Sequence, residues 1–485
     1  MSHKQFIRDV IIVGSTQILI NASSFLLLPI IAKTLGVFDY GIWSQLTVTR
    51  TLLTFVAILG LSSAFIRFFP SKTDKKEISK GFFSIFFFIA LLSLVISGIL
   101  IVFSTPISQF LFDTSTYSPL IPLTSFLIIL NALYTIAIFY FRIYRQMLVY
   151  AGLTIFTSIG QIPLTIFLLV SLGYGIYGVV YAALFSYLVP LIIALILIIK
   201  QVGFSLPSLS EMPEYLRFSL PLAPSSLIFW ITTSSDRYII GFLLGASSVG
   251  IYSAGYNIGY LIYLFVIPLQ IILLPELSKL HDKGEIEEVK TYTSYSLKFF
   301  LLIAIPSVVG FTVLANQILV LLTTIKFING SSVIPLVGLS ALFSGLFQII
   351  INICILYKKT IHNFWIQACS ALLNLCLNFL LIPIIGIIGA AIATLFSFMI
   401  MCILAYIVSR KYLRFKIDKL FISKIILSSI FMGLIILLLK ERISVILLIL
   451  IGIATYFIFC YAFKIFNKQE ISFFKNIIRF PKRSN

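Results

Sequence analysis

Hydrophobic residues in this chain gather in long runs that are separated by short polar segments. About 20 consecutive apolar residues cross the hydrocarbon core of a bilayer as one helix, and each run has about this length. The runs predict fourteen spanning helices, at residues 10–32, 42–66, 81–103, 119–141, 149–171, 175–199, 218–243, 249–274, 297–322, 332–356, 363–384, 386–408, 421–439 and 443–463. The pattern therefore predicts an all-α integral membrane protein.

The amino-acid composition excludes most soluble classes of protein. Of the 485 residues, 60% are hydrophobic and 11% are charged, whereas about 25% of the residues of a soluble globular protein are charged. This composition excludes a cytosolic enzyme, a secreted domain and a disordered protein. The first apolar run is too long for a cleavable signal peptide. The five cysteines lie in apolar runs without paired spacing, so they predict neither disulfides nor a metal site.

The positions of the lysines and arginines predict the orientation in the membrane. Cytoplasmic loops carry an excess of these residues. If the N-terminus is cytoplasmic, nearly all of them fall on the cytoplasmic side, and the outer segments hold only Lys33, Lys326, Lys440 and Arg442. We therefore expect a multi-pass protein of the cell membrane with both termini in the cytoplasm. The net charge of +19 reflects this topology and attraction to anionic lipid, and does not predict a nucleic-acid partner.

The C-terminal tail combines apolar residues at helical spacing with basic neighbours. This pattern suits either a short amphipathic helix at the membrane interface or a plain solvated tail. The residues concerned are Ile471, Phe474, Ile477 and Ile478 with Lys475, Arg479 and Lys482.

Two blocks of sequence recur at nearly the same offset. Residues 35–44 resemble residues 244–253, which follow 209 positions later, and residues 175–187 resemble residues 386–398, which follow 211 positions later. The blocks link spans 1–6 to spans 7–12, so these spans form two copies of one six-helix unit. Because six is even, both copies have the same orientation. Parallel repeats of this kind are typical of transporters whose substrate site lies between the two halves.

The repeat divides the chain into four regions. Residues 1–200 form an N-terminal lobe of six spans, and residues 201–216 form a cytoplasmic loop between the lobes. Residues 217–409 form the C-terminal lobe. Residues 410–485 hold two extra spans and the basic tail.

Three stretches carry a family resemblance along roughly residues 5–465, and the chain resembles polysaccharide exporters of the O-antigen flippase (Wzx) type. The resemblance implies the fold of the multidrug/oligosaccharidyl-lipid/polysaccharide exporter superfamily, in which two lobes form a V-shaped, MATE-like cavity that opens to alternate sides. It implies a polyprenyl-pyrophosphate oligosaccharide as cargo, flipped from the cytoplasmic to the outer leaflet. It leaves open whether a polysaccharide polymerase and a chain-length regulator are partners. The stretches are Leu28-Pro29-Ile30-Ile31-Ala32 with Leu35-Gly36 and Tyr40-Gly41; Ser219-Leu220-Pro221 with Trp230, Asp236-Arg237-Tyr238-Ile239-Ile240-Gly241 and Gly250-Ile251-Tyr252; and Asn378 with Ile382-Pro383 and Gly386-Ile387-Ile388-Gly389-Ala390-Ala391.

Three charged residues fall inside predicted spans, where each costs about 2.5–3.5 kcal/mol on insertion scales. Arg50 and Arg237 are candidates for holding the pyrophosphate in a cationic cavity, because the guanidinium fork binds phosphate oxygens in pairs. The alternative is that each arginine reaches the outer headgroups or pairs with a structural carboxylate. Asp236 is a candidate for H⁺ or Na⁺ coupling, or else the structural partner of an arginine. Adjacent positions lie about 100° apart on a helix, so we do not expect Asp236 and Arg237 to face each other squarely.

Neutral polar residues form stripes at helical spacing. Gln17 and Asn21 share one face of span 1, and they are candidates for the substrate cavity. The alternative for every stripe is hydrogen bonding between helices. Further polar or aromatic positions at helical spacing are Gln348 and Asn352; Gln367, Asn374 and Asn378; and Tyr252, Tyr256, Tyr260 and Tyr263, which are candidates for interface anchors or sugar stacking.

Two rival functions remain. A MATE-type exporter of small cations needs an acidic cavity, whereas two arginines and one aspartate lie in these spans. A glycan polymerase or ligase at the outer face needs a large outer loop, and the longest predicted one, residues 104–118, is short. No phosphate-binding loop or metal-ligand spacing is present. The sequence thus predicts a transporter that is not an enzyme, has no resident cofactor and uses a gradient or product removal.

Overall fold

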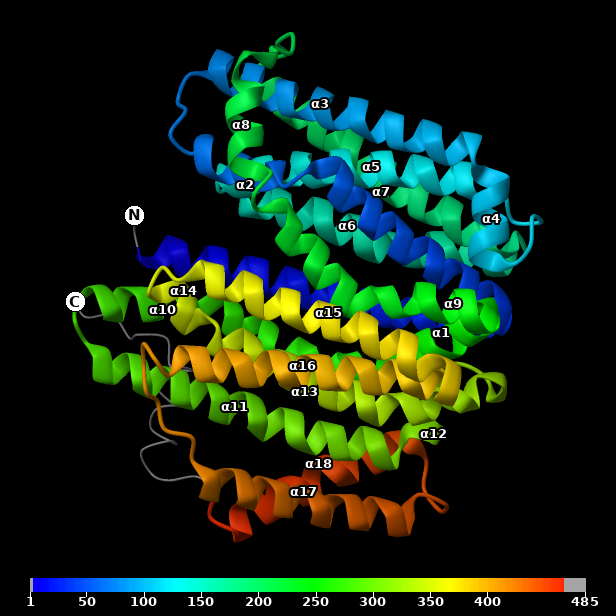
Figure 1. Cartoon of the computed structure of the whole chain (residues 1–485), viewed down its shortest axis with the longest axis vertical. Helices are drawn as coiled ribbons and strands as arrows, with labels where there is room; N and C mark the ends of the chain where they lie inside the picture. Colours follow the sequence, from blue (N-terminus) through cyan, green and yellow to red (C-terminus); the bar gives the residue numbers. More distant parts are fainter. Residues whose placement is uncertain (1–2, 466–485) are drawn as a thin grey trace. The chain divides into compact units, whose positions relative to one another are not determined.

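The computed structural model describes residues 3–465 of the chain (Figure 1). The tail segment predicted to be amphipathic, residues 471–482, lies outside the described residues. Within residues 3–465 the secondary structure is helical, with no strand. The prediction of an all-α protein is confirmed.

Most helices are long and apolar, and a few short ones lie between them. In chain order they are α1 (His3–Ile58), α2 (Leu61–Phe68), α3 (Lys75–Val102), α4 (Ser104–Phe112), α5 (Leu120–Ile143), α6 (Met147–Thr165), α7 (Gly175–Val202), α8 (Met212–Ser219), α9 (Ala223–Gly259), α10 (Ile267–Asp282), α11 (Ile286–Val313), α12 (Ala315–Leu322), α13 (Val333–Ile350), α14 (Asn352–Leu356), α15 (Thr360–Ile385), α16 (Ile387–Ser409), α17 (Lys419–Leu439) and α18 (Val445–Ala462). A π-helical segment extends α6 (Ile166–Ser171), and 3-10 turns occupy Leu209–Glu211, Tyr260–Val266 and Ile325–Ser332.

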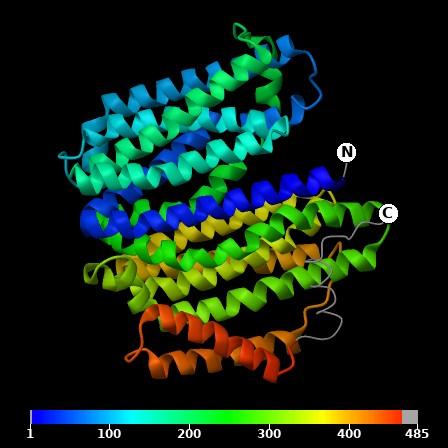
Figure 2. The ribbon, with the colours of Figure 1, turned by 180° about the vertical axis from the view of Figure 1, so that it is seen from behind.

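Twelve helical stretches of residues 3–465 are long and apolar enough to cross a membrane. Two of them, Ile12–Ile58 with 47 residues and Ala223–Asp282 with 60 residues, each contain two of the fourteen predicted spans. Straight helices of these lengths would measure about 70 and 90 Å at 1.5 Å per residue, far more than the membrane core of about 30 Å. Figures 1 and 2 show that α1 instead doubles back on itself. The protein is therefore a multi-pass membrane protein with the predicted pattern of spans.

The repeated blocks have matching backbone conformations. Gly36 and Gly245 interrupt α1 and α9 with nearly the same torsions, φ 78° and ψ −175° against φ 81° and ψ 170°. Gly175 and Gly386, in the second pair of blocks, have φ 54° and 64°. Glycine adopts positive φ without the steric cost that a Cβ would bring. These paired breaks support the two six-helix repeats that the sequence predicts.

The two copies of the first block pack against each other. The hydroxyl oxygens of Ser44 and Ser253, which are 209 residues apart, lie 2.6 Å from each other. A Cβ on Gly41 would fall 1.8 Å from the Ala246 carbonyl oxygen, and a Cβ on Gly250 would fall 2.1 Å from the Val37 carbonyl oxygen. Small residues thus let the two helix backbones touch.

The chain divides into two compact units, which we describe separately. The first unit comprises Met1–Asn257, Leu319–Val333 and Ile361–Met401, and the second comprises Ile258–Ile318, Ile334–Thr360 and Cys402–Asn485.

Helix α8 belongs to the core of the first unit, although its N-terminal half falls in the predicted loop 201–216. Tyr215 is 2% exposed and packs with the aromatic side chains of Phe68 and Phe69. The Nζ of Lys72 donates to Glu211 Oε2 over 2.7 Å, just before α8. Burial raises the pKa of Glu211, but hydrogen bonds from Lys72 and Tyr215 outweigh it and leave the pKa below its usual value.

In the second unit the last two helices pack on α11. The hydroxyl of Tyr456 in α18 donates to the Leu302 carbonyl oxygen over 2.7 Å. A Cβ on Gly433 of α17 would lie 2.8 Å from a methyl group of Val309. The two spans that follow the repeat are thus part of a folded unit.

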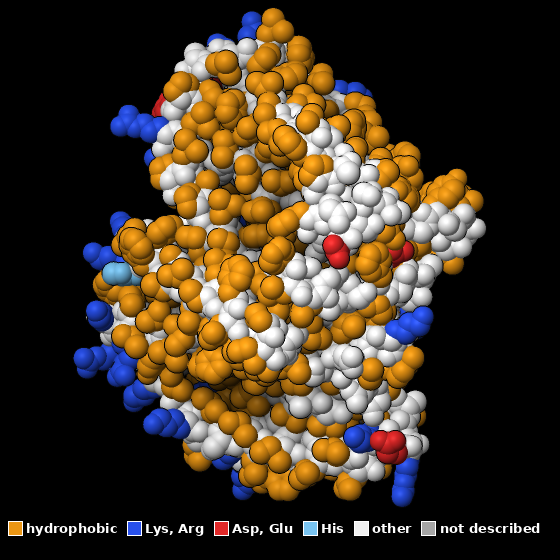
Figure 3. All heavy atoms as spheres, turned by 45° about the vertical axis from the view of Figure 1, so that its right-hand side comes forward, with side chains coloured by type: hydrophobic (Ala, Val, Ile, Leu, Met, Phe, Trp, Pro, Cys, Tyr) orange, Lys and Arg blue, Asp and Glu red, His pale blue; other side chains and the backbone are white. Residues whose placement is uncertain are grey.

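The surface is rich in large hydrophobic side chains. Leu91, Leu438 and Ile446 are examples, each more than 60% exposed. On the face in Figure 3, hydrophobic side chains predominate, and most of the visible Lys and Arg side chains lie along one edge. Apolar exposure on this scale is compatible with lipid around the protein and not with water.

Candidate functional site

Asp236 and Arg237 lie in the middle of α9 and form a buried ion pair. The Nη1 of Arg237 donates to Asp236 Oδ1 over 2.9 Å and to the Thr233 carbonyl oxygen over 2.7 Å. The two residues are 5% and 1% exposed, respectively. The expectation that these neighbours do not face each other squarely missed this pair, because the long arginine side chain folds back along the helix to its neighbour's carboxylate.

Two tyrosines of α9 complete the surroundings of this pair. The guanidinium carbon of Arg237 lies 4.0 Å from the ring centre of Tyr256 and 5.6 Å from that of Tyr252. The Tyr252 hydroxyl donates to Asp236 Oδ2. Cation–π contact adds stabilisation where the cation is desolvated. Both tyrosines are buried, so they are neither interface anchors nor exposed sugar-stacking rings in this arrangement.

A polar face of α15 meets α9 beside the ion pair. Ser235 Oγ donates to Asn374 Oδ1 over 3.5 Å, and Asn378 Nδ2 donates to the same oxygen over 2.9 Å. Asn374 Nδ2 and Asn378 Oδ1 are buried and have no hydrogen-bond partner within residues 3–465. The predicted stripe on span 11 thus shares a buried face, with Gln367 bound to Asn363 one turn away.

The described part of the chain contains no group of three or more His, Cys, Asp or Glu side chains that could hold a metal ion.

Arg50 differs sharply from Arg237. Its guanidinium carbon lies 5.6 Å from the ring centre of Tyr187 on α7. Its Nε is buried and has no hydrogen-bond partner, and no carboxylate of the described residues lies within 4.0 Å of the side chain. The side chain is half-buried. Arg50 therefore carries a charge in a spanning helix that no carboxylate among these residues neutralises.

Gln17 and Asn21 occupy the first half of α1, and both are half-buried. The Asn21 Nδ2 group is buried without a hydrogen-bond partner among residues 3–465. Of the five predicted site residues, the structure joins only Asp236 and Arg237 by hydrogen bonds; the partners found for Arg50 and Asn21 do not include the other candidates.

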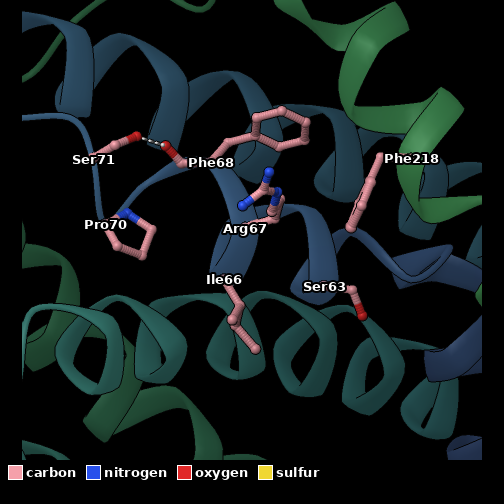
Figure 4. Close-up of a pocket in the computed structure, with 7 residues that line it drawn as sticks. All are labelled: Ser63, Ile66, Arg67, Phe68, Pro70, Ser71 and Phe218. Atoms are coloured by element: carbon pink, nitrogen blue, oxygen red, sulfur yellow. Dashed lines mark hydrogen bonds between the residues drawn. The ribbon is translucent and has the colours of Figure 1, made fainter. Parts of the chain in front are cut away.

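A pocket of about 850 Å³ lies at the end of α2, and sequence reasoning missed it. In Figure 4 the exposed guanidinium of Arg67 lies between the rings of Phe68 and Phe218, with Ser63 and Ser71 on either side. Phe218 comes from α8, far along the chain from α2. No periodicity in the sequence could have indicated that these segments meet.

Spanning helices in two repeated halves, with a charged residue left unpaired inside a span, define the architecture of a secondary transporter. The chain matches the family model described as "Polysaccharide biosynthesis protein" over residues 6–281, and it belongs to this family. A second family model, "MatE", matches residues 221–380.

Two curated relatives come from Haloferax volcanii. The chain is 33% identical to "Probable flippase AglR" over 175 residues, which are 35% of this chain and 36% of that protein. It is 26% identical to "Probable low-salt glycan biosynthesis flippase Agl15" over 274 residues, which are 55% of this chain and 57% of that protein. The chain thus spans between about a third and somewhat over half of the length of these relatives.

Solved structures show the same fold. "Lipid II flippase MurJ, inward closed conformation" has a TM-score of 0.78 and 20% identity, covering 98% of this chain and all of that one. The MATE transporter VcmN of Vibrio cholerae has a TM-score of 0.61 and 16% identity, covering 84% of this chain and 96% of that one. The predicted MATE-like fold is confirmed. The names of these relatives denote flippases and a transporter, in agreement with the prediction that the chain is not an enzyme.

Proposed function

We propose that this protein flips a polyprenyl-pyrophosphate oligosaccharide from the cytoplasmic to the outer leaflet during synthesis of a surface polysaccharide. The family, the names of the relatives and the two parallel repeats support a lipid-linked glycan as cargo. The observation that carries the proposal is Arg50, a charge inside a spanning helix whose Nε has no hydrogen-bond partner within residues 3–465.

Arg50 suits the pyrophosphate of such a cargo. Burying an unpaired charge in a membrane is expensive, so the cost has to be offset by a ligand or by water. The guanidinium presents several N–H donors in one plane, and phosphate oxygens accept them in pairs. Tyr187 holds one face of the guanidinium at 5.6 Å and leaves its edge for the ligand. The buried amide of Asn21, with Gln17 one turn earlier, would donate to glycan hydroxyls or to the pyrophosphate.

Arg237 has a structural role in this proposal. Its hydrogen bonds to Asp236 and Thr233 and its contact with Tyr256 already satisfy the charge. A pyrophosphate at this site would have to break the ion pair. Arg237 therefore holds α9 in shape, and Arg50 is the arginine that contacts the cargo.

Asp236 is the candidate for coupling to H⁺ or Na⁺. Its two carboxylate oxygens accept from Arg237 and Tyr252. A bound cation would compete with Arg237 for this carboxylate, and the exchange would change the packing of α9 between two states. Flipping by an Asp236→Asn variant should then lose its response to an imposed ion gradient, while an unchanged response would exclude this role.

Residues 1–200 and 217–409 would form the two lobes that alternate their opening, with residues 201–216 between them and residues 410–485 added behind. Both termini would lie in the cytoplasm, as the lysine and arginine distribution favours. A polysaccharide polymerase and a chain-length regulator would act on the flipped product as partners. Alternating access of this kind needs no cofactor.

The MatE match over residues 221–380 favours a second candidate, a MATE-type exporter of small cations. The charge balance opposes it. A cationic drug needs an accessible carboxylate, and Asp236 is 1% exposed and paired with Arg237.

Flipping itself tests the proposal. The purified full-length protein is placed in liposomes with a fluorescent polyprenyl-pyrophosphate oligosaccharide, and access to a membrane-impermeant quencher is followed. Folded Arg50→Ala protein should flip at least about tenfold more slowly, because a charge-assisted hydrogen bond contributes about 1.5–3 kcal/mol. Arg142→Ala is the matched control, since Arg142 also lies over an aromatic ring, at 5.8 Å from Phe139, but at the end of a helix. Equal loss in both variants, or none in Arg50→Ala, would remove Arg50 from the site. Absence of flipping by the wild-type protein, with efflux of a small cation instead, would support the second candidate.

A further inference from the structure

An apolar pocket of about 380 Å³ lies within the second unit. Its walls come from three spanning helices and include Leu301 of α11, Leu346 of α13 and Ile403 of α16. We refer to this space as the inner pocket. A cavity with such walls inside a membrane protein suits a hydrocarbon chain better than water.

The segment just before α17 forms the mouth of the inner pocket and is tied to α11. Ser294 Oγ donates to the Lys416 carbonyl oxygen over 3.1 Å, and Lys298 Nζ donates to Asp418 Oδ2 over 2.8 Å. Asp418 Oδ1 also accepts from the backbone N–H of Phe421 and caps α17. The only carboxylate among the lining residues is therefore already neutralised.

Five basic side chains in this segment are exposed, and none of them lies within 4.0 Å of a carboxylate in residues 3–465. The positive-inside rule places the segment on the cytoplasmic side. Clusters of basic residues next to spanning helices on this side attract anionic lipid headgroups. The five are Arg410, Lys411, Arg414, Lys416 and Lys419.

We propose that the inner pocket binds one anionic phospholipid of the cytoplasmic leaflet, with an acyl chain against Leu301, Leu346 and Ile403 and the phosphate on Arg414 and Lys416. The two halves of this surface fit one amphiphile. The apolar walls require a hydrocarbon chain, and the unpaired cations at the mouth require a negative headgroup. The proposal does not depend on the cargo of the transporter.

A lipid bound in this way would tie α17 to α11 from the lipid side. The existing ties are the Lys298–Asp418 ion pair and the Ser294 hydrogen bond, both at the surface. An acyl chain between α11, α13 and α16 would fill the space directly behind them. The bound lipid should therefore raise the thermal stability of the full-length protein.

Native mass spectrometry of the full-length protein tests the proposal. The protein is mixed with phosphatidylglycerol or phosphatidylcholine of identical chains, and the fraction that retains one lipid is measured. We expect phosphatidylglycerol to bind at least about tenfold more tightly and to raise the melting temperature. Equal retention of the two lipids would overturn the proposal. The soluble headgroup glycerophosphoglycerol, which lacks acyl chains, should not compete; full competition would show an anion site without the inner pocket.

Two variants separate the halves of the surface. Arg414→Glu with Lys416→Glu changes only exposed side chains and should abolish the preference for phosphatidylglycerol. Lys440→Glu with Arg442→Glu, at the other end of α17, is the matched control of equal charge and should retain the preference. Leu346→Trp fills the inner pocket and should lower retention of both lipids, with folding checked by the melting temperature. The proposal fails if the control pair lowers retention as much as the first pair. If Leu346→Trp unfolds the protein, the smaller change Ile403→Phe replaces it, and unchanged retention by folded Ile403→Phe protein would equally contradict the proposal.

Discussion

Arg50 and Arg237 lie at similar depths in their predicted spans, yet their surroundings differ. Arg237 is 5% exposed and binds a carboxylate, a carbonyl oxygen and the face of Tyr256. Arg50 contacts the ring of Tyr187, and its Nε has no hydrogen-bond partner within residues 3–465. A charge in a membrane is therefore not by itself a sign of a ligand site. The partner group distinguishes a structural arginine from one that is available to a substrate.

The difference has a physical consequence. Removing one partner of a buried ion pair leaves the other charge uncompensated. Removing a charge that has no partner takes away a cost of the folded state and only the contacts with a ligand. Changes around Arg237 should therefore lower stability, and changes at Arg50 should lower function.

The largest expected effect comes from breaking the ion pair. Asp236→Ala leaves the Arg237 guanidinium buried without a counter-charge, and the free energy of unfolding should fall by about 3–5 kcal/mol. The exposed Asp282→Ala is the control and should change little. Thermal unfolding in detergent measures both. The double variant Asp236→Ala/Arg237→Leu should recover most of the loss, and a double variant as unstable as Asp236→Ala would contradict a structural ion pair.

The next effect concerns the contact between the helix pairs that carry the two arginines. A Cβ on Gly250 would lie 2.1 Å from the Val37 carbonyl oxygen, so Gly250→Ala must push the two backbones apart. Overpacking costs about 1–3 kcal/mol. Gly98→Ala, with nothing within 4 Å of the new Cβ, is the control and should be neutral or stabilising. Equal melting temperatures of the two variants would show that the contact is loose.

A smaller effect separates the two aromatic contacts. Tyr256→Leu removes the ring at 4.0 Å from the Arg237 guanidinium, and the free energy of unfolding should fall by about 1–2 kcal/mol. Tyr187→Leu, beside the half-buried Arg50, should cost about 0.5–1 kcal/mol. Unfolding in detergent measures the order of the two losses. The reverse order would mean that Arg50, and not Arg237, depends on its ring for stability.

The smallest effect contrasts the buried pair with the surface pair Lys72–Glu211. The pKa of Glu211 is below its usual value, so the pair stabilises the folded protein above the ordinary pKa of glutamate. This stabilisation is lost as the pH falls through the pKa of the folded state. Because Glu211 is 46% exposed, the loss should stay below about 1 kcal/mol. Melting temperatures at neutral and acidic pH should converge for wild type and Glu211→Gln, and a constant gap would exclude this pair as the cause.

The spans and the repeat could be predicted from the sequence because both depend on local features. An apolar run has the length of a membrane, and Gly36 and Gly245 break their helices wherever the rest of the chain lies. The ion pair of Asp236 and Arg237 could not be predicted from helix geometry, since it depends on how a flexible side chain folds back. The contacts of Phe218 with α2 and of Ser235 with Asn374 join residues far apart in the chain, and no spacing marks them.

The most direct test of the central claim is the affinity of the folded protein for a polyprenyl-pyrophosphate lipid. Wild type, Arg50→Ala, Arg50→Lys and Arg237→Lys are compared at equal fractions of folded protein. We expect Arg50→Ala to bind roughly 10- to 100-fold more weakly, which corresponds to the loss of one charge-assisted hydrogen bond, and Arg50→Lys to lie between the two. Folded Arg237→Lys should bind as wild type does. Unchanged affinity of Arg50→Ala, together with weakened binding by Arg237→Lys, would contradict the assignment of the two arginines.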